Sequence, residues 1–121
     1  MMTIAAVLLT CASLVAVDGD TIKCDGVNMR DMGDGKPFVW GYDAPEISKP
    51  NCQEELDLGR AAKAAMSEML PGALVYDWGM RDRYGRPLVS VRLPNGRAVG
   101  SILISEGLAR SWSPKYRPDW C

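Results

Sequence analysis

The sequence contains no histidine. This absence excludes the Ser-His-Asp triads of many hydrolases, and it excludes zinc sites that depend on imidazole ligands. Any acid–base chemistry in this chain therefore has to use carboxylates, lysine, tyrosine or cysteine.

The chain also has little excess charge. Its 14 Lys and Arg residues oppose 15 Asp and Glu residues, which leaves a formal net charge of −1. A nearly neutral protein exerts no long-range attraction on nucleic acid, so any bound phosphate has to be held by a few placed arginines. The sequence has no repeats, low-complexity segments or linkers, and its 121 residues fit one domain.

None of the 4 cysteines forms a CxxC pair, which excludes zinc-ribbon and thioredoxin-type sites. An even number in a small chain suits two disulfides, with three possible connectivities. Cys52 is the most natural partner of Cys121, the last residue, whereas Cys11 and Cys24 flank the first expected hairpin. The alternative is that all of these cysteines are reduced, buried thiols in a cytosolic protein.

The N-terminus gives a weaker indication of export than the cysteines do. Residues 1–9 are apolar enough for the hydrophobic part of a signal segment, so residues 1–10 are a candidate remnant of one. No Lys or Arg precedes Lys23, so the positively charged start of such a segment is missing. The run is also too short to span a bilayer. We expect a monomeric secreted or periplasmic protein without a membrane span.

Hydrophobic patterning in the first part of the chain predicts a meander of three strands, over residues 7–17, 21–24 and 27–30. Asp18-Gly19 and Asp25-Gly26 lie between them, and Asp-Gly is a strong hairpin signal because Gly accepts positive φ at no steric cost. Residues 31–37 are too rich in Gly, Asp and Pro for regular structure. Residues 38–42 then resume a strand or extend the third one.

The second part of the chain predicts two helices around two strands. Apolar residues at helical spacing indicate a helix over residues 52–70, with Asn51 as N-cap and Glu54 completing a capping box. Strands over residues 73–78 and 87–93 enclose a polar loop, residues 79–86. A second helix over residues 98–106 ends at Gly107, and the tail, residues 108–121, is expected to be irregular.

This order of elements is typical of one fold class. A five-stranded sheet with a helix between strands three and four is the signature of an OB-type barrel. We therefore predict an α+β, mainly β, OB-fold barrel with a second helix near the C-terminus. Residues 1–121 would form this single domain.

Two acidic segments, Asp18-Gly19-Asp20-Thr21 and Asp43-Ala44-Pro45-Glu46, lie at strand ends and are expected on the same rim of the barrel. Asp20 and Asp43 would offer hard oxygen ligands, with a backbone carbonyl, to a cation such as Ca²⁺. Glu46 would contact the metal through water or act as general base. Taken alone, each segment is better explained as a solvated turn. Neither has the ligand spacing of an EF-hand.

A third segment, Arg81-Asp82-Arg83-Tyr84-Gly85-Arg86-Pro87, places three guanidinium groups and an aromatic ring in one loop. The planar fork of arginine matches phosphate oxygens, and Tyr84 offers a ring face or a hydroxyl beside them. The alternative is an exposed polar hairpin loop with internal Arg–Asp pairs.

Taken in order, these segments resemble the three signatures of the staphylococcal nuclease-like (thermonuclease) family, and Gly107-Leu108-Ala109-Arg110 resembles a later segment of it. The resemblance covers nearly the whole chain and implies an OB-fold that hydrolyses phosphodiesters in DNA and RNA with Ca²⁺. It implies roles for residues that match the signatures. Calcium ligands would be Asp20, Asp43 and the carbonyl of Ala44; catalytic groups would be Glu46 and Arg86; Asp18 and Thr21 would support the ligands; Arg83 and Tyr84 would lie along the nucleotide.

The second catalytic arginine of the family requires an insertion in this chain. In the family it stands five residues before the aspartate matched by Asp43, where this sequence has Phe38. Treating residues 34–41 as an insertion restores the spacing and assigns Arg30. Asp31 follows it, where the family usually has an apolar residue, and its charge is expected to pair with Arg30.

The resemblance implies a metal-assisted attack of water on phosphorus, with Glu46 activating or orienting the water and Arg30 and Arg86 stabilising the phosphate oxygens. The function predicted is therefore a calcium-dependent endonuclease. One alternative is a non-catalytic OB-type module that binds nucleic acid or a protein partner. Another is a disulfide-tied secreted domain whose motifs are accidental.

Overall fold

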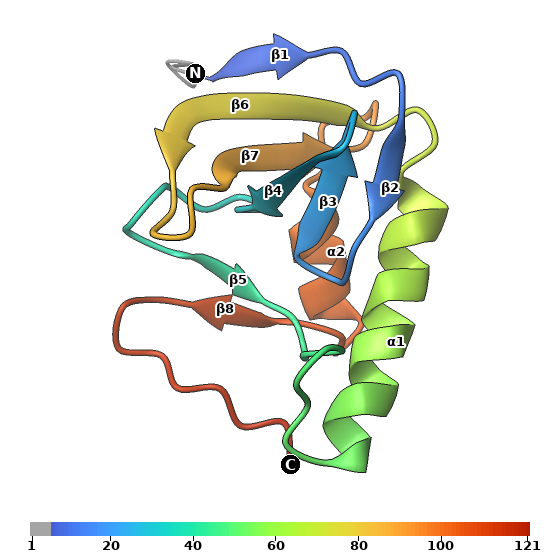
Figure 1. Ribbon diagram of the computed structural model, residues 1–121, viewed down its shortest axis with the longest axis vertical. Coiled ribbons are helices and arrows are strands. Elements are labelled where there is room, and N and C mark those ends of the chain that lie inside the picture. The colour runs from blue at the N-terminus through green and yellow to red at the C-terminus, as the bar shows by residue number, and fades with distance from the viewer. Residues whose placement is uncertain (1–5) are drawn as a thin grey trace.

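A computed structural model describes residues 6–121, which form a curled six-stranded sheet, a small second sheet and two helices (Figure 1). In the larger sheet the strand order is β1-β6-β7-β4-β3-β2, and only β4 and β7 run parallel. The strands are β1 (Val7–Leu9), β2 (Leu14–Ala16), β3 (Thr21–Cys24), β4 (Val27–Asp31), β6 (Leu74–Arg81) and β7 (Pro87–Arg92). The smaller sheet pairs β5 (Gly41–Asp43) with β8 (Arg110–Trp112).

The predicted continuous first strand is wrong. Residues 7–17 form two short strands, of which β1 pairs with β6 and β2 pairs with β3, so the chain crosses between the two edges of the sheet. A connection this short joins opposite edges only if the sheet curls on itself. Cys11 lies in this connection and forms a disulfide with Cys24. Residues 1–5 of the expected signal remnant lie outside the described residues.

Two helices support the curled sheet. Helix α1 (Gln53–Met69) lies against β2, and α2 (Val99–Ser105) packs against α1 and β7. Buried apolar side chains from both helices and the sheet form the core, among them Ile22, Met66, Val89, Val99 and Leu103. The architecture is the mainly β, OB-like one expected, but the described residues contain eight strands, not five, and α1 follows the fifth strand rather than the third. The split first strand and the β5–β8 pair account for the difference.

The predicted N-cap of the first helix is wrong by one residue. Cys52 has extended backbone and its Sγ accepts a hydrogen bond from the Glu55 backbone N–H at 3.4 Å. Glu55, not Glu54, reaches back to accept from the backbone N–H of Asn51 at 2.8 Å. The disulfide between Cys52 and Cys121 fixes this start of the helix.

Two predicted loops are partly strand. Strand β6 continues to Arg81 through a register shift after Asp77, so the polar loop shrinks to residues 82–86. The tail was expected to be irregular, but β8 pairs with β5 because Gly107, with φ 75°, turns the chain back after α2. The position of Gly107 just after the second helix is as predicted.

Both disulfides join the pairs that the sequence favoured, Cys11–Cys24 and Cys52–Cys121, and both are compatible with an extracellular protein. Of the helices in residues 6–121, none combines the length and the apolar character needed to cross a membrane.

Candidate active site

The segment from Asp18 to Thr21 connects β2 to β3 and forms a loop held by its own first carboxylate. Asp18 Oδ1 accepts hydrogen bonds from the backbone N–H groups of Asp20, at 3.0 Å, and Thr21, at 2.8 Å. Gly19 does not adopt the positive φ expected of a hairpin glycine. Its lack of a side chain is needed for another reason, because a Cβ there would lie 2.7 Å from the Cβ atoms of Ala44 and Ala62. The loop is therefore wedged between the start of the second acidic segment and helix α1.

Asp20 is the buried centre of this loop. Its Oδ2 accepts from the backbone N–H of Ala44 at 2.9 Å and forms an ion pair with Arg30 Nη1 at 2.7 Å. Its Oδ1 accepts from the Thr21 hydroxyl at 3.2 Å. Burial favours the neutral acid, but the charge of Arg30 and the hydrogen bonds outweigh it and lower the pKa of Asp20 below the ordinary 3.8. Asp20 is therefore a carboxylate at neutral pH.

Arg30, at the end of β4, reaches the site despite the insertion that follows it. Besides the ion pair, its Nη2 donates to the carbonyl of Tyr42 at 2.5 Å, and its side chain is largely buried. Burial would lower the pKa of Arg30, but the charge of Asp20 outweighs it and raises that pKa, so the guanidinium stays charged.

The expected pairing of Asp31 with Arg30 is wrong. Consecutive residues of a strand point to opposite faces, and the Asp31 side chain lies fully buried on the other side of β4. It accepts hydrogen bonds from the backbone N–H groups of Gly33 and Val91, both at 3.0 Å, and from the Tyr42 hydroxyl at 2.8 Å. Asp31 thus holds the chain on the core side of the site.

Arg86, at the end of the loop between β6 and β7, reaches the residue next to Asp20. Its Nε forms an ion pair with Asp82 Oδ2 at 2.7 Å, and its Nη1 donates to the Thr21 hydroxyl at 3.0 Å. Thr21 therefore links Arg86 to Asp20. The predicted internal Arg–Asp pair of this loop exists and fixes the direction of the Arg86 side chain.

Asp43, at the end of β5, is half-buried and carries one contact that the sequence did not reveal. The Tyr116 hydroxyl donates to its Oδ2 at 3.2 Å, and this tyrosine lies in the tail that the second disulfide fixes. Burial, followed by the negative charge of Asp20, raises the pKa of Asp43 to about 6. The spacing of Tyr116 in the sequence gave no signal for this contact, because it depends on where the tail folds.

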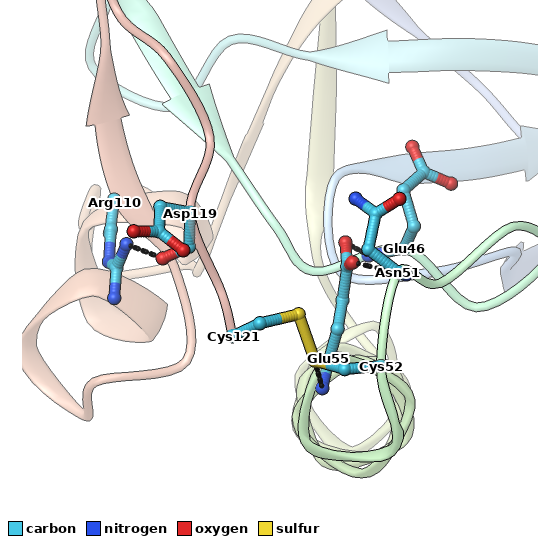
Figure 2. The surroundings of a disulfide bond; sticks show 7 residues. All are labelled: Glu46, Asn51, Cys52, Glu55, Arg110, Asp119 and Cys121. Atoms are coloured by element: carbon cyan, nitrogen blue, oxygen red, sulfur yellow. Dashed lines mark hydrogen bonds between the residues drawn. A yellow bond between two sulfur atoms is a disulfide. The ribbon is translucent and has the colours of Figure 1, made fainter.

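Glu46 lies on the loop between β5 and α1, and its carboxylate is directed away from Glu55 (Figure 2). The backbone N–H of Glu46 donates to Glu55 Oε2 at 3.1 Å, so the buried Glu55 at the start of α1 holds this loop. Partial burial raises the pKa of Glu46, the charges of Asp20 and Glu55 raise it further, and the positive charges of Arg30 and Arg86 oppose the rise. Glu46 thus shares the electrostatic environment of the other site residues.

A cleft of about 510 Å³ opens beside these groups. Its lining includes Arg30, Asp43 and Arg86 from the predicted set, together with Arg83 and Tyr84. Arg83 donates to the Tyr84 hydroxyl at 2.8 Å, and the Tyr84 ring is 69% exposed. The cleft is also lined by three further aromatic residues that the sequence did not single out as site residues, Phe38, Tyr42 and Trp112.

The family comparison agrees with this geometry. A family model described as "Staphylococcal nuclease homologue" matches residues 39–119, about two thirds of the 121-residue chain. The chain belongs to the staphylococcal nuclease homologue family. The match includes the second acidic segment and the arginine loop of this nuclease-family protein, whereas Asp20 and Arg30 precede it. The chain matches no individual protein among the curated proteins compared.

The donor chemistry of the site fits a hard divalent cation such as Ca²⁺. Negative charge on Asp20 contributes to the raised pKa values of Asp18, which reaches about 7, of Asp43 and of Glu46. These carboxyls repel one another, and a cation would relieve the repulsion. The ligands are not preassembled, since residues 6–121 contain no group of three or more acidic or cysteine side chains close enough to hold a metal. Protein donors also occupy the Asp20 carboxylate.

Proposed function

We propose that this nuclease-family protein is a calcium-dependent endonuclease that hydrolyses phosphodiester bonds in DNA, RNA or both. The observation that carries the proposal is that Arg30 and Arg86 line one cleft, while Arg30 forms an ion pair with Asp20 and Arg86 donates to the adjacent Thr21. Two guanidinium groups so placed match the oxygens of a single phosphate group. The disulfides support a secreted or periplasmic location.

Calcium would be held by Asp20, Asp43 and the carbonyl of Ala44, and it would supply charge to stabilise the phosphate oxygens. Asp18 shapes the loop that presents Asp20, and Thr21 connects that loop to Arg86. A simple hairpin does not require the Asp-Gly-Asp-Thr spacing. The contacts of Asp18 and Thr21 give a structural reason for it.

The remaining steps of the reaction are assigned to side chains of the protein. Arg30 exchanges its ion pair with Asp20 for a phosphate oxygen, and Arg86 binds a second oxygen while Asp82 keeps its guanidinium oriented. Glu46 orients or deprotonates the attacking water, and the rise in its pKa makes its carboxylate a stronger base. Arg83 and Tyr84, at the open edge of the cleft, would lie along the neighbouring nucleotide.

The test is cleavage of plasmid DNA and of an RNA of the same length with Ca²⁺, repeated with a chelator. We expect cleavage only with Ca²⁺. Glu46→Gln and Arg86→Ala should each lower kcat by about 10²- to 10³-fold without changing the urea midpoint of unfolding. Glu68→Gln and Arg60→Ala are matched controls because both residues are exposed on α1. Unchanged activity in either site variant contradicts the assignment, and a gel shift without cleavage indicates the non-catalytic binding module.

A further inference from the structure

The insertion at residues 34–41 forms a small, closed turn between Arg30 and Asp43. Lys36 and Trp40 exchange backbone hydrogen bonds of 3.0 and 3.2 Å across it. Asp34, at its base, forms an ion pair with Arg92 on β7 at 3.0 Å. The turn is thus held both internally and against the main sheet, so the backbone at its tip has a defined position.

Phe38 lies at the tip of this turn in an unfavourable backbone conformation. Its φ is 66°, in the left-handed region that bulky residues rarely adopt. Such conformations cost free energy and persist mainly at sites where function requires them. The Phe38 side chain is 62% exposed, so burial in a core does little to offset the cost.

Phe38 is instead one of the residues that line the cleft that contains Arg30, Arg86 and Tyr84. Figure 1 shows the connection from β4 to β5, which carries Phe38, at the same end of the molecule as the turn between β6 and β7, which carries Tyr84. An exposed ring beside two phosphate-binding arginines offers a nucleobase a stacking surface. In a duplex, by contrast, the faces of the bases are already covered by their neighbours.

We propose that Phe38, in the insertion of this chain, stacks on an unpaired base of the bound strand and thereby lowers the KM for single-stranded nucleic acid. This inference rests on the proposed nuclease function, which it extends to substrate selection. With a net charge of −1, the protein exerts no long-range attraction on nucleic acid, so local contacts in the cleft must supply the affinity. Stacking also tolerates any base, because every base has a π-face.

The test compares the KM for a single-stranded oligonucleotide with the KM for the duplex of the same sequence, both with Ca²⁺. Phe38→Ala should raise the single-strand KM about tenfold, toward the lower end of the range for one stacked base, and leave kcat and the duplex KM within about twofold. Phe38→Trp should restore the single-strand KM, whereas Phe38→Leu should not. Val39→Ala is the matched control, because Val39 is 59% exposed in the same turn but does not line the cleft.

The outcomes separate this inference from the proposed function. If the wild-type protein cleaves and Phe38→Ala has an unchanged single-strand KM, the stacking role is refuted and the nuclease stands. If the wild-type protein does not cleave, fluorescence anisotropy of a labelled single strand measures binding directly. About tenfold weaker binding by Phe38→Ala than by the wild type supports stacking in a binding module. Absent or unchanged binding overturns the inference as well.

Discussion

The buried Asp31 offers the sharpest test of how the fold supports the site. Its Oδ1 accepts hydrogen bonds from the backbone N–H groups of Gly33 and Val91, and its Oδ2 accepts from the Tyr42 hydroxyl. Two substitutions separate its shape from its charge. Asp31→Asn keeps an oxygen that can accept both N–H groups, and Asp31→Leu removes the acceptor at similar volume.

The expected costs follow from the count of orphaned donors. Asp31→Leu leaves two buried N–H groups without a partner, at about 1–3 kcal/mol each, so the free energy of unfolding should fall by about 2–6 kcal/mol. The Tyr42 hydroxyl keeps an alternative acceptor in the Gly19 carbonyl, 2.9 Å away. In Asp31→Asn the amide NH₂ donates to that hydroxyl, so no buried donor or acceptor is lost, and near pH 4 the loss of stability should stay below about 1 kcal/mol.

The free energy of unfolding should depend on pH because of the charge on Asp31, and the direction of the shift in its pKa gives the sign of that dependence. Burial raises the pKa of Asp31 from 3.8 to about 6, against the hydrogen bonds from Gly33, Val91 and Tyr42. Between these pH values the folded protein retains a proton that the unfolded chain has released, so this group lowers the free energy of unfolding as the pH rises through that window. The loss is about 3 kcal/mol, and Asp31→Asn should escape it.

Urea unfolding followed by tryptophan fluorescence, at pH values from about 4 to about 7 with a chelator present, measures these differences. The chelator removes stabilisation by bound Ca²⁺. We expect Asp31→Asn and the wild type to agree near pH 4 and the variant to become the more stable one by pH 7. If instead Asp31→Asn is as unstable as Asp31→Leu at pH 7, the charge rather than the acceptor geometry holds the strand, and the reasoning is refuted.

Two further perturbations test the tail. Cys121→Ser opens a disulfide with a sequence separation of 69 and should lower the free energy of unfolding by about 4 kcal/mol. Cys24→Ser opens one with a separation of 13 and should lower it by about 3 kcal/mol. Urea unfolding measures both. The reverse order would show that the tail adds little to the fold. Tyr116→Phe removes a hydrogen bond that lowers the pKa of Asp43, so that pKa should rise and Ca²⁺ should compete less well with protons. The Ca²⁺ concentration for half-maximal cleavage should therefore increase more at pH 6 than at pH 8, and equal shifts would exclude this cause.

The local sequence determined several features of this protein directly. Helix α1 lies within a residue of its predicted ends because its apolar spacing and the following Pro71-Gly72 act over a few residues. Asp25 and Gly26 both have positive φ, as a two-residue hairpin turn requires. The acidic and arginine segments also indicated the family, and the match to the family model includes the second acidic segment and the arginine loop.

The tertiary structure decided where those groups meet. Arg30 reaches Asp20 across a strand pairing, and Asp31 turns into the core because side chains alternate along β4. Tyr116 reaches Asp43 only because the tail pairs as β8 and is anchored by Cys121. Such contacts depend on register and chain closure, which local sequence preferences do not encode. The sequence by itself therefore determined which functional groups this protein has, and the curled sheet determined which of them share one cleft.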